Sequence, residues 1–268
     1  MIVIFALFGA AIGSFLNVCI DRLPAGKSLI HQPSHCDACQ RRLQPVDMVP
    51  VVSYLVLRGR CRYCRARVPR RVLWVEVIST ALMAFLYWHY GLTIQLAVSI
   101  YYCCLFLTIA FIDLDHKLIL NKIIYPSLLI AVLIDVFIPP SAVLDSLMGD
   151  VTLLSGFIHG GAALNGILGG ALGFVLLLII ALVFRGGMGW GDVKMAGLIG
   201  LATGFPLVLV SLLLAILLGG LSAGLLLLLR IKKRRDAIPF GPFLSLAAIA
   251  TLLWGQEILN WYLGLFVR

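Results

Sequence analysis

The sequence predicts an all-α membrane protein with about eight transmembrane helices and one small polar insert. Composition is the first support: the 268 residues are 62% hydrophobic and only 12% charged, whereas soluble domains carry about 25% charged residues. The mean hydropathy is +1.06. The second support is that the apolar residues form runs long enough to span a bilayer, which takes about 20 residues. These observations exclude a soluble enzyme and a disordered chain.

The N-terminal half predicts four spans. The run Met1–Ile20 lacks the basic n-region and cleavage site of a signal peptide, so it predicts a retained helix. The long polar stretch Asp21–Arg71 follows it. The uncharged run Val77–Ile112 is too long for one span, and its aromatic residues at 88–91 are typical of a membrane interface, so it predicts a helical hairpin. A fourth helix is expected from about Ile123 to Ile138, before two prolines.

The C-terminal half predicts four more spans. Gly160–Phe184 forms the fifth helix. The apolar stretch 195–229 is again too long for one span and breaks near 203–206, which leaves a short sixth helix, Val193–Thr203, tilted or re-entrant. A seventh span follows this break, and Ala237–Gln256 is the eighth. Within the fifth helix, adjacent small residues predict close packing against a neighbouring helix.

The basic residues predict the topology. If residues 21–71 are cytoplasmic, alternation also places the loops at 113–122, 185–194 and 230–236 in the cytoplasm. These four segments carry 20 of the 21 Lys and Arg residues, whereas 139–159 carries none, as the positive-inside rule requires. The net charge of +9 therefore predicts contact with the lipid bilayer. No stacking aromatic platform accompanies the arginines, so no nucleic-acid partner is expected, and no feature indicates an oligomeric state.

Two Cys-x-x-Cys pairs, 21 residues apart, predict a zinc site in the polar insert. Four thiolates leave no open position for water, so this metal would be structural. An insert of about 50 residues has too little apolar surface for a core of its own, which explains the need for a metal. A redox role for one pair, and ligation by His31 or His35, remain alternatives. The four cysteines are Cys36, Cys39, Cys61 and Cys64.

Three acidic residues lie at predicted cytoplasmic helix ends: Asp113 and Asp115 after the third helix, and Asp192 before the sixth. Two facing carboxylates can share one proton, so that one activates water while the other polarises a scissile carbonyl, as in aspartyl proteases. Residues i and i+2 point to different sides of a helix, so only one of Asp113 and Asp115 can face Asp192. The glycines around Asp192 would let an extended substrate approach. The alternative is structural, with Asp192 as the N-cap of the sixth helix.

The chain resembles the type IV prepilin peptidases, the bacterial members of the GxGD aspartyl proteases. The resemblance covers nearly the whole chain, and five motifs occur in the family's order. They are Gly13-Ser14-Phe15-Leu16-Asn17-Val18, the two cysteine pairs followed by Glu76, Asp113-x-Asp115-His116, Gly189-x-Gly191-Asp192-x-Lys194, and Ile238-Pro239-Phe240-Gly241-Pro242-Phe243. Leu120 stands where the family has a proline, in the turn after the first aspartate. The replacement affects the shape of this turn, but the proline supplies no chemical group to the reaction.

The resemblance implies a bifunctional, multi-pass enzyme of the bacterial inner membrane with its active site on the cytoplasmic side. Such enzymes remove the leader peptide of prepilins or pseudopilins after a glycine. Most of them then N-methylate the new N-terminal residue with S-adenosylmethionine.

The resemblance also implies roles for individual residues. Asp113 and Asp192 would be the catalytic pair, and the four cysteines would bind zinc and support the methyltransferase part. Glu76 and Asn17 are candidate cofactor contacts. The plainer interpretation of Glu76 is an ion pair with a local arginine beside the membrane, and that of Asn17 is an amide that packs between helices. The secondary candidates in the catalytic loops are Asp115, Gly189, Gly191 and Lys194.

Two other functions compete with this one. The first is a GxGD protease that cuts inside transmembrane segments, which the zinc loop disfavours. The second is a proton-coupled transporter, which would carry acids near the bilayer midplane rather than at helix ends. The predicted domains are the first transmembrane helix (1–20), the cytoplasmic zinc-binding loop domain (21–71) and a seven-helix catalytic body (72–268).

Overall fold

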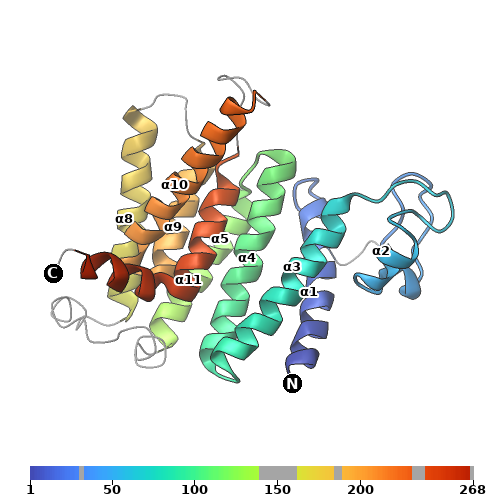
Figure 1. Cartoon of the computed structure of the whole chain (residues 1–268), viewed down its shortest axis with the longest axis horizontal. Helices are drawn as coiled ribbons and strands as arrows, with labels where there is room; N and C mark the ends of the chain where they lie inside the picture. The colour runs from blue at the N-terminus through green and yellow to red at the C-terminus, as the bar shows by residue number, and fades with distance from the viewer. Residues whose placement is uncertain (30–32, 139–161, 184–188, 231–238, 266–268) are drawn as a thin grey trace. The chain divides into compact units, whose positions relative to one another are not determined.

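The computed structural model describes residues 1–29, 33–138, 162–183, 189–230 and 239–265, and these residues are all-helical apart from loops and two isolated β-bridges (Figure 1). Eight long helices and two short ones make up this part of the chain. The long helices are α1 (Ile2–Arg22), α3 (Arg70–Tyr90), α4 (Ile94–His116), α5 (Asn121–Phe137), α8 (Ala162–Val183), α9 (Trp190–Thr203), α10 (Leu207–Leu228) and α11 (Gly241–Gly264), and the short ones are η1 (Pro45–Met48) and α2 (Val52–Val56).

The eight long helices correspond one to one to the eight predicted spans. Six of them, all except α5 and α9, are long and apolar enough to cross a membrane. The helix α5 has 17 residues and α9 has 14, fewer than the about 20 that a perpendicular span needs. The short sixth helix is thus confirmed, and the chain is a multi-pass membrane protein.

Both predicted breaks are confirmed. Helix α3 ends before Gly91, and α9 ends before Gly204; these glycines have φ of 60° and 70°, a backbone conformation that residues with a Cβ rarely adopt. The break after α9 also contains the cis peptide bond before Pro206.

Some predicted boundaries are wrong. Helix α4 continues to His116, so Asp113 and Asp115 belong to its last turns rather than to a loop. Helix α11 begins at Gly241 and extends to Gly264, with a non-helical residue at Trp254. Some predictions lie outside the described residues: the loop at 139–159, both ends of the fifth helix at 160–161 and 184, the loop residues 185–188, most of the basic run at 230–236, the start of the eighth helix at 237–238, and His31 as an alternative ligand.

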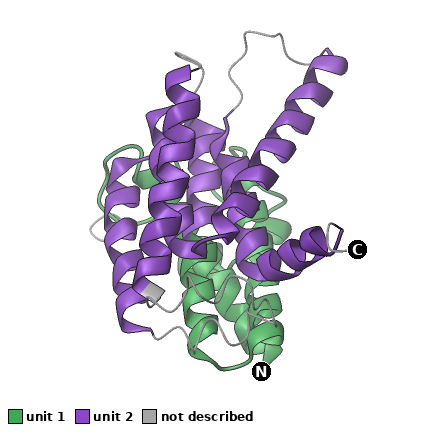
Figure 2. Ribbon diagram, turned by 90° about the vertical axis from the view of Figure 1, so that its left-hand side faces the viewer, with its two compact units in different colours: residues 1–104 green, residues 105–268 purple. Residues whose placement is uncertain are grey.

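The chain forms two compact units, Met1–Cys104 and Leu105–Arg268 (Figure 2). In the first unit, α1 packs along α3. The Asn17 side chain donates to the carbonyl of Val72 at 3.0 Å, and the rings of Phe5 and Tyr87 stack with centroids 4.4 Å apart. The polar insert, with η1 and α2, connects these two helices in the sequence.

In the second unit, α9 is the central helix and contacts α5, α8, α10 and α11. Its residues from Met195 to Gly200 are all buried. Gly169 of α8 faces Gly200 of α9, and a Cβ on either would collide with the backbone of the other. The predicted close packing of the fifth helix is therefore confirmed, and this contact holds α9, which carries Asp192 in its first turn.

Candidate active site and metal centre

Asp113 is the buried carboxylate of the candidate active site. It lies in the last turns of α4 and is 5% exposed. Its Oδ2 accepts a hydrogen bond of 3.0 Å from the backbone N–H of Gly241, the first residue of α11. The first N–H groups of a helix have no partner within that helix, so the start of α11 is free to orient a carboxylate. This bond fixes the Asp113 side chain against α11.

Asp192 lies in the first turn of α9, close enough to Asp113 for their charges to interact. Burial, and to a lesser extent the negative charge of Asp113, raises the pKa of Asp192 to about 6, although a hydrogen bond from the Gly189 backbone opposes the rise. Two interacting carboxylates of this kind titrate as a pair that retains one proton over a range of pH. Asp115, in contrast, is exposed, so the two acids of this motif point to different sides of α4.

The alternative in which Asp192 is the N-cap of α9 is wrong, because Gly189 occupies that position and Asp192 follows three residues later. The Asp192 N–H donates to the Gly189 carbonyl at 3.1 Å. A carboxylate in the first turn still interacts favourably with the helix dipole. The glycine therefore begins the helix, and the aspartate presents its charge beside Asp113.

Gly191 has a different role from the expected one. A Cβ at this position would lie 2.7 Å from the Cβ of Ile119, which belongs to the loop between α4 and α5. The missing side chain thus makes room for the protein's own loop, and not only for a substrate. Leu120, in place of the family proline, directly precedes α5 as its N-cap residue, and the packing of Ile119 on Gly191 holds this loop.

Lys194 joins the start of α5 to the start of α9. Its Nζ donates to Asn121 Oδ1 at 2.9 Å and to Tyr125 Oη at 3.0 Å, and it lies 5.1 Å from the centroid of the Tyr125 ring. Both partners belong to the first two turns of α5. Lys194 therefore positions the two helices that flank the loop around Ile119, while Asp192 lies half a turn away on the same helix.

The four cysteines of the insert converge on one point. Their Sγ atoms all lie within 4.8 Å of one another, and the Sγ atoms of Cys36 and Cys64 are 3.8 Å apart. Thiolates bound at about 2.3 Å to a tetrahedral zinc ion would be about 3.8 Å apart. This donor set fits a metal of the zinc type.

The two cysteine pairs form equivalent turns. Cys36 N–H donates to the Arg41 carbonyl and Cys61 N–H to the Ala66 carbonyl, five residues on in each case. The residue four positions after each first cysteine, Gln40 or Arg65, has a positive φ of 56° or 57°. Backbone hydrogen bonds from Cys64 and Tyr63 lower the pKa of Cys61 to about 7, whereas burial and the neighbouring thiols raise the pKa of Cys64 to about 11. In the absence of a metal, only Cys61 of these two therefore favours the thiolate that a metal requires.

Glu76 and Asn17 lie at the contact between α1 and α3. Glu76 is 5% exposed, and its Oε2 accepts the N–H of Val51 at 2.7 Å; Val51 itself has a φ of 60°. Glu76 thus fastens the insert to α3, rather than forming the ion pair with an arginine that was the plainer interpretation. Asn17 is 6% exposed, and its Oδ1 has no partner among the described residues.

Sequence reasoning missed two functional contacts. The first is the Gly241 N–H on Asp113; a Cβ at Gly241 would lie 2.7 Å from the carboxylate oxygen. A Gly-Pro pair at the start of a helix is a usable signal, because it combines a helix start with a backbone that another group can approach. The second is the packing of Ile119 on Gly191, for which the sequence holds no signal.

These features define a multi-pass membrane protein with two interacting carboxylates at helix ends, the arrangement of a membrane aspartyl protease. Residues 7–90 match the family model described as "Bacterial Peptidase A24 N-terminal domain", and residues 100–224 match the "Type IV leader peptidase family". The chain belongs to the type IV prepilin leader peptidase family.

Similar curated proteins each carry the name prepilin leader peptidase/N-methyltransferase. The protein of Legionella pneumophila is 31% identical over 98% of this chain and 95% of its own length. The protein of Pseudomonas aeruginosa is 30% identical over 96% and 91%, and that of Bacillus subtilis is 28% identical over 98% of both chains. No solved structure matches this chain.

Proposed function

We propose that this protein removes the leader peptide of prepilins or pseudopilins and N-methylates the new N-terminal residue. The observation that carries the peptidase is the interaction between Asp113, held by the start of α11, and Asp192 in the first turn of α9. The names of relatives that match nearly the full length support both activities. The positive-inside pattern supports an inner-membrane location with the active site on the cytoplasmic side.

The cleavage step uses one proton shared by the pair. The ionised carboxylate takes a proton from a water molecule, and the oxygen of this water attacks the scissile carbonyl carbon. The protonated carboxyl of the pair donates a hydrogen bond to the carbonyl oxygen. The resulting tetrahedral intermediate collapses, the C–N bond breaks, and the leaving amine takes a proton from the pair. The Gly241 N–H keeps the Asp113 side chain in one orientation during these steps.

Residues 21–71 would form a zinc-binding loop domain between the first transmembrane helix (1–20) and a helical body (72–268) in the sequence. Zinc on the four cysteines would be structural, since four thiolates leave no position for water. It would hold together an insert whose only helices in the described part are η1 and α2.

S-adenosylmethionine would supply a methyl group on a positively charged sulfur. Two acceptors at the contact between α1 and α3 fit a cationic ligand: the Glu76 carboxylate and Asn17 Oδ1, which is buried without a partner among the described residues. Glu76→Gln and Asn17→Leu should weaken binding of radiolabelled S-adenosylmethionine in equilibrium dialysis and leave leader cleavage intact. Ser79→Ala, buried on the same face of α3, is the matched control.

The test of the proposed function is mass spectrometry of a prepilin incubated with the purified protein, with and without S-adenosylmethionine. We expect loss of the leader in both samples and one added methyl group only with the methyl donor. Leader loss without methylation would withdraw the transferase. Absence of cleavage by the folded protein would contradict the peptidase.

A further inference from the structure

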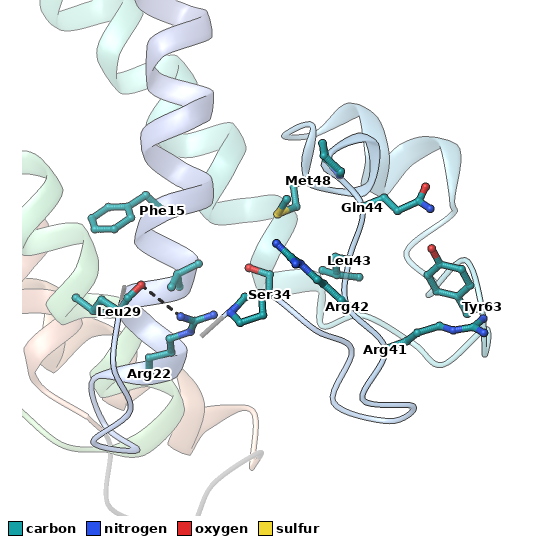
Figure 3. Close-up of a pocket in the computed structure, with 13 residues that line it drawn as sticks. Phe15, Arg22, Leu29, Ser34, Arg41, Arg42, Leu43, Gln44, Met48 and Tyr63 are labelled. Atoms are coloured by element: carbon teal, nitrogen blue, oxygen red, sulfur yellow. Dashed lines mark hydrogen bonds between the residues drawn. The ribbon is translucent and has the colours of Figure 1, made fainter. Parts of the chain in front are cut away.

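The first unit contains a pocket that the proposed reaction does not use. It lies between the last two turns of α1 and the polar insert, and its volume is about 880 Å³ (Figure 3), within the range of about 300–1,000 Å³ for sites that hold a small molecule. The thirteen lining residues are Phe15, Val18, Arg22, Leu29, Pro33, Ser34, Arg41, Arg42, Leu43, Gln44, Pro45, Met48 and Tyr63.

One wall of the pocket runs from the apolar part of a membrane span to its charged end. Phe15, Val18 and Arg22 share one face of α1, at a spacing of three and four residues. Arg22 is the last residue of this candidate span. Phe15 is 55% exposed and lies about 10 Å along the helix axis from Arg22. A membrane span that ends at Arg22 would place Phe15 at hydrocarbon depth and Arg22 at the level of the lipid headgroups.

The other wall is apolar and cationic. Leu43 and Met48 of the insert face the pocket together with Arg41 and Arg42, and none of the thirteen lining residues is acidic. Figure 3 shows Arg22 and Arg42 both directed toward the space between α1 and the insert. A ligand that matches this surface has an anionic group and an apolar part.

Two of the arginines are held in place. Arg22 Nη1 donates to the carbonyls of Ser28 and Leu29 at 3.1 and 3.3 Å, and a guanidinium has two further nitrogens that can bind an anion. Arg41 lies 4.7 Å above the centroid of the Tyr63 ring. Of the two, Arg22 is the one preorganised to donate to phosphate oxygens, which guanidinium groups bind in a fixed geometry.

We propose that this pocket binds one anionic phospholipid of the cytoplasmic leaflet. The phosphate lies between Arg22 and Arg42, and an acyl chain follows Phe15 and Val18. Basic pockets on the cytoplasmic side of membrane helices bind such headgroups. S-adenosylmethionine fits less well, because it carries a net positive charge and would meet three arginines without a lining carboxylate. A bound lipid would tie the zinc-binding insert to the membrane surface.

The test is native mass spectrometry of the detergent-purified full chain with equal amounts of dioleoyl phosphatidylglycerol and dioleoyl phosphatidylcholine. We expect the wild-type protein to retain phosphatidylglycerol about tenfold better. Arg22→Gln with Arg42→Gln should abolish this preference. The matched control is Arg60→Gln with Arg67→Gln, since these exposed arginines of the insert do not line the pocket. If the first double variant does not fold, Arg42→Gln alone should reduce the preference about threefold to fivefold.

Three results would overturn the proposal. The first is an unchanged lipid preference in the pocket variants, or a loss equal to that of the control variant. The second is displacement of phosphatidylglycerol by an equal concentration of glycerol 3-phosphate, which would make the pocket a site for soluble phosphates. The third is displacement by S-adenosylmethionine, which would make it the methyl donor's site. Leader cleavage is measured on the same samples, so a failure of the peptidase is distinguished from a failure of lipid binding.

Discussion

Gly241→Ala is expected to reduce leader cleavage without unfolding the protein. The new Cβ would lie 2.7 Å from Asp113 Oδ2, whereas ordinary contacts begin at 3.4 Å, so the carboxylate must move by about 0.7 Å. The same movement weakens the hydrogen bond from the Gly241 N–H. A misplacement of about 1 Å in a catalytic group can cost about 100-fold in rate. We therefore expect kcat to fall by roughly 100-fold, with little change in KM.

The assay is the initial rate of prepilin cleavage, followed by mass spectrometry over a range of substrate concentrations. Gly220→Ala in α10 is the matched control, because a Cβ there meets nothing within 4 Å and alanine is the better helix former by about 1 kcal/mol. Cleavage by Gly241→Ala within about threefold of the wild-type rate would refute the positioning of Asp113 by α11. A loss of equal size in the control would show that the assay reports folding instead.

The other predictions concern the pair, the loop and the metal. The pKa of Asp192 is raised to about 6, so the pair holds its shared proton below that pH and loses it above. The value of kcat/KM should therefore fall by about tenfold per pH unit on the alkaline side. A flat profile of kcat/KM from pH 5 to about pH 8 would contradict this. Gly191→Val should collide with Ile119 and lower the cleavage rate at least about tenfold, and Ile119→Ala should restore part of it; absence of rescue argues against the contact. Lys194→Met should remove two hydrogen bonds and lower the midpoint of thermal unfolding by a few degrees, measured by fluorescence, and an unchanged midpoint would refute its role in joining α5 to α9. Cys36→Ser should reduce bound zinc, measured by atomic emission, and make the insert sensitive to protease; retention of one zinc per chain would exclude Cys36 as a ligand.

The helices were predictable because their signal is long and local. A span requires about 20 apolar residues in a row, and glycine marks the ends of α3 and α9, where φ is positive. The last turns of α4 were not predictable, because Asp113 and Asp115 look like loop residues when only their charge is considered. They stay helical since Asp113 is buried and bonded to α11, a contact between residues 128 positions apart.

In the candidate site, too, the features set by local sequence were predictable, and those set by distant neighbours were not. The cysteine spacing predicts the cluster, since each pair forms a local turn and four sulfurs need only two such turns. The roles of Gly191 and Gly241 depend instead on what a Cβ would meet across the fold, Ile119 in one case and Asp113 in the other. Local patterns do not show which neighbour meets a glycine, so Gly191 looked like part of an open approach to a substrate, and Gly241 stood only within a family motif.

The central claim is that Asp113 and Asp192 act as one catalytic pair. The most direct measurement is the rate of leader removal by Asp113→Asn, Asp192→Asn and the double variant. The control is Asp115→Asn, the same substitution at an exposed aspartate. Each single variant should lose at least about 1,000-fold, and the double variant should lose no more than either alone, because residues that act as a unit are not additive. The control should cleave at close to the wild-type rate. Appreciable cleavage by either single variant, or independent losses that multiply in the double variant, would contradict the account.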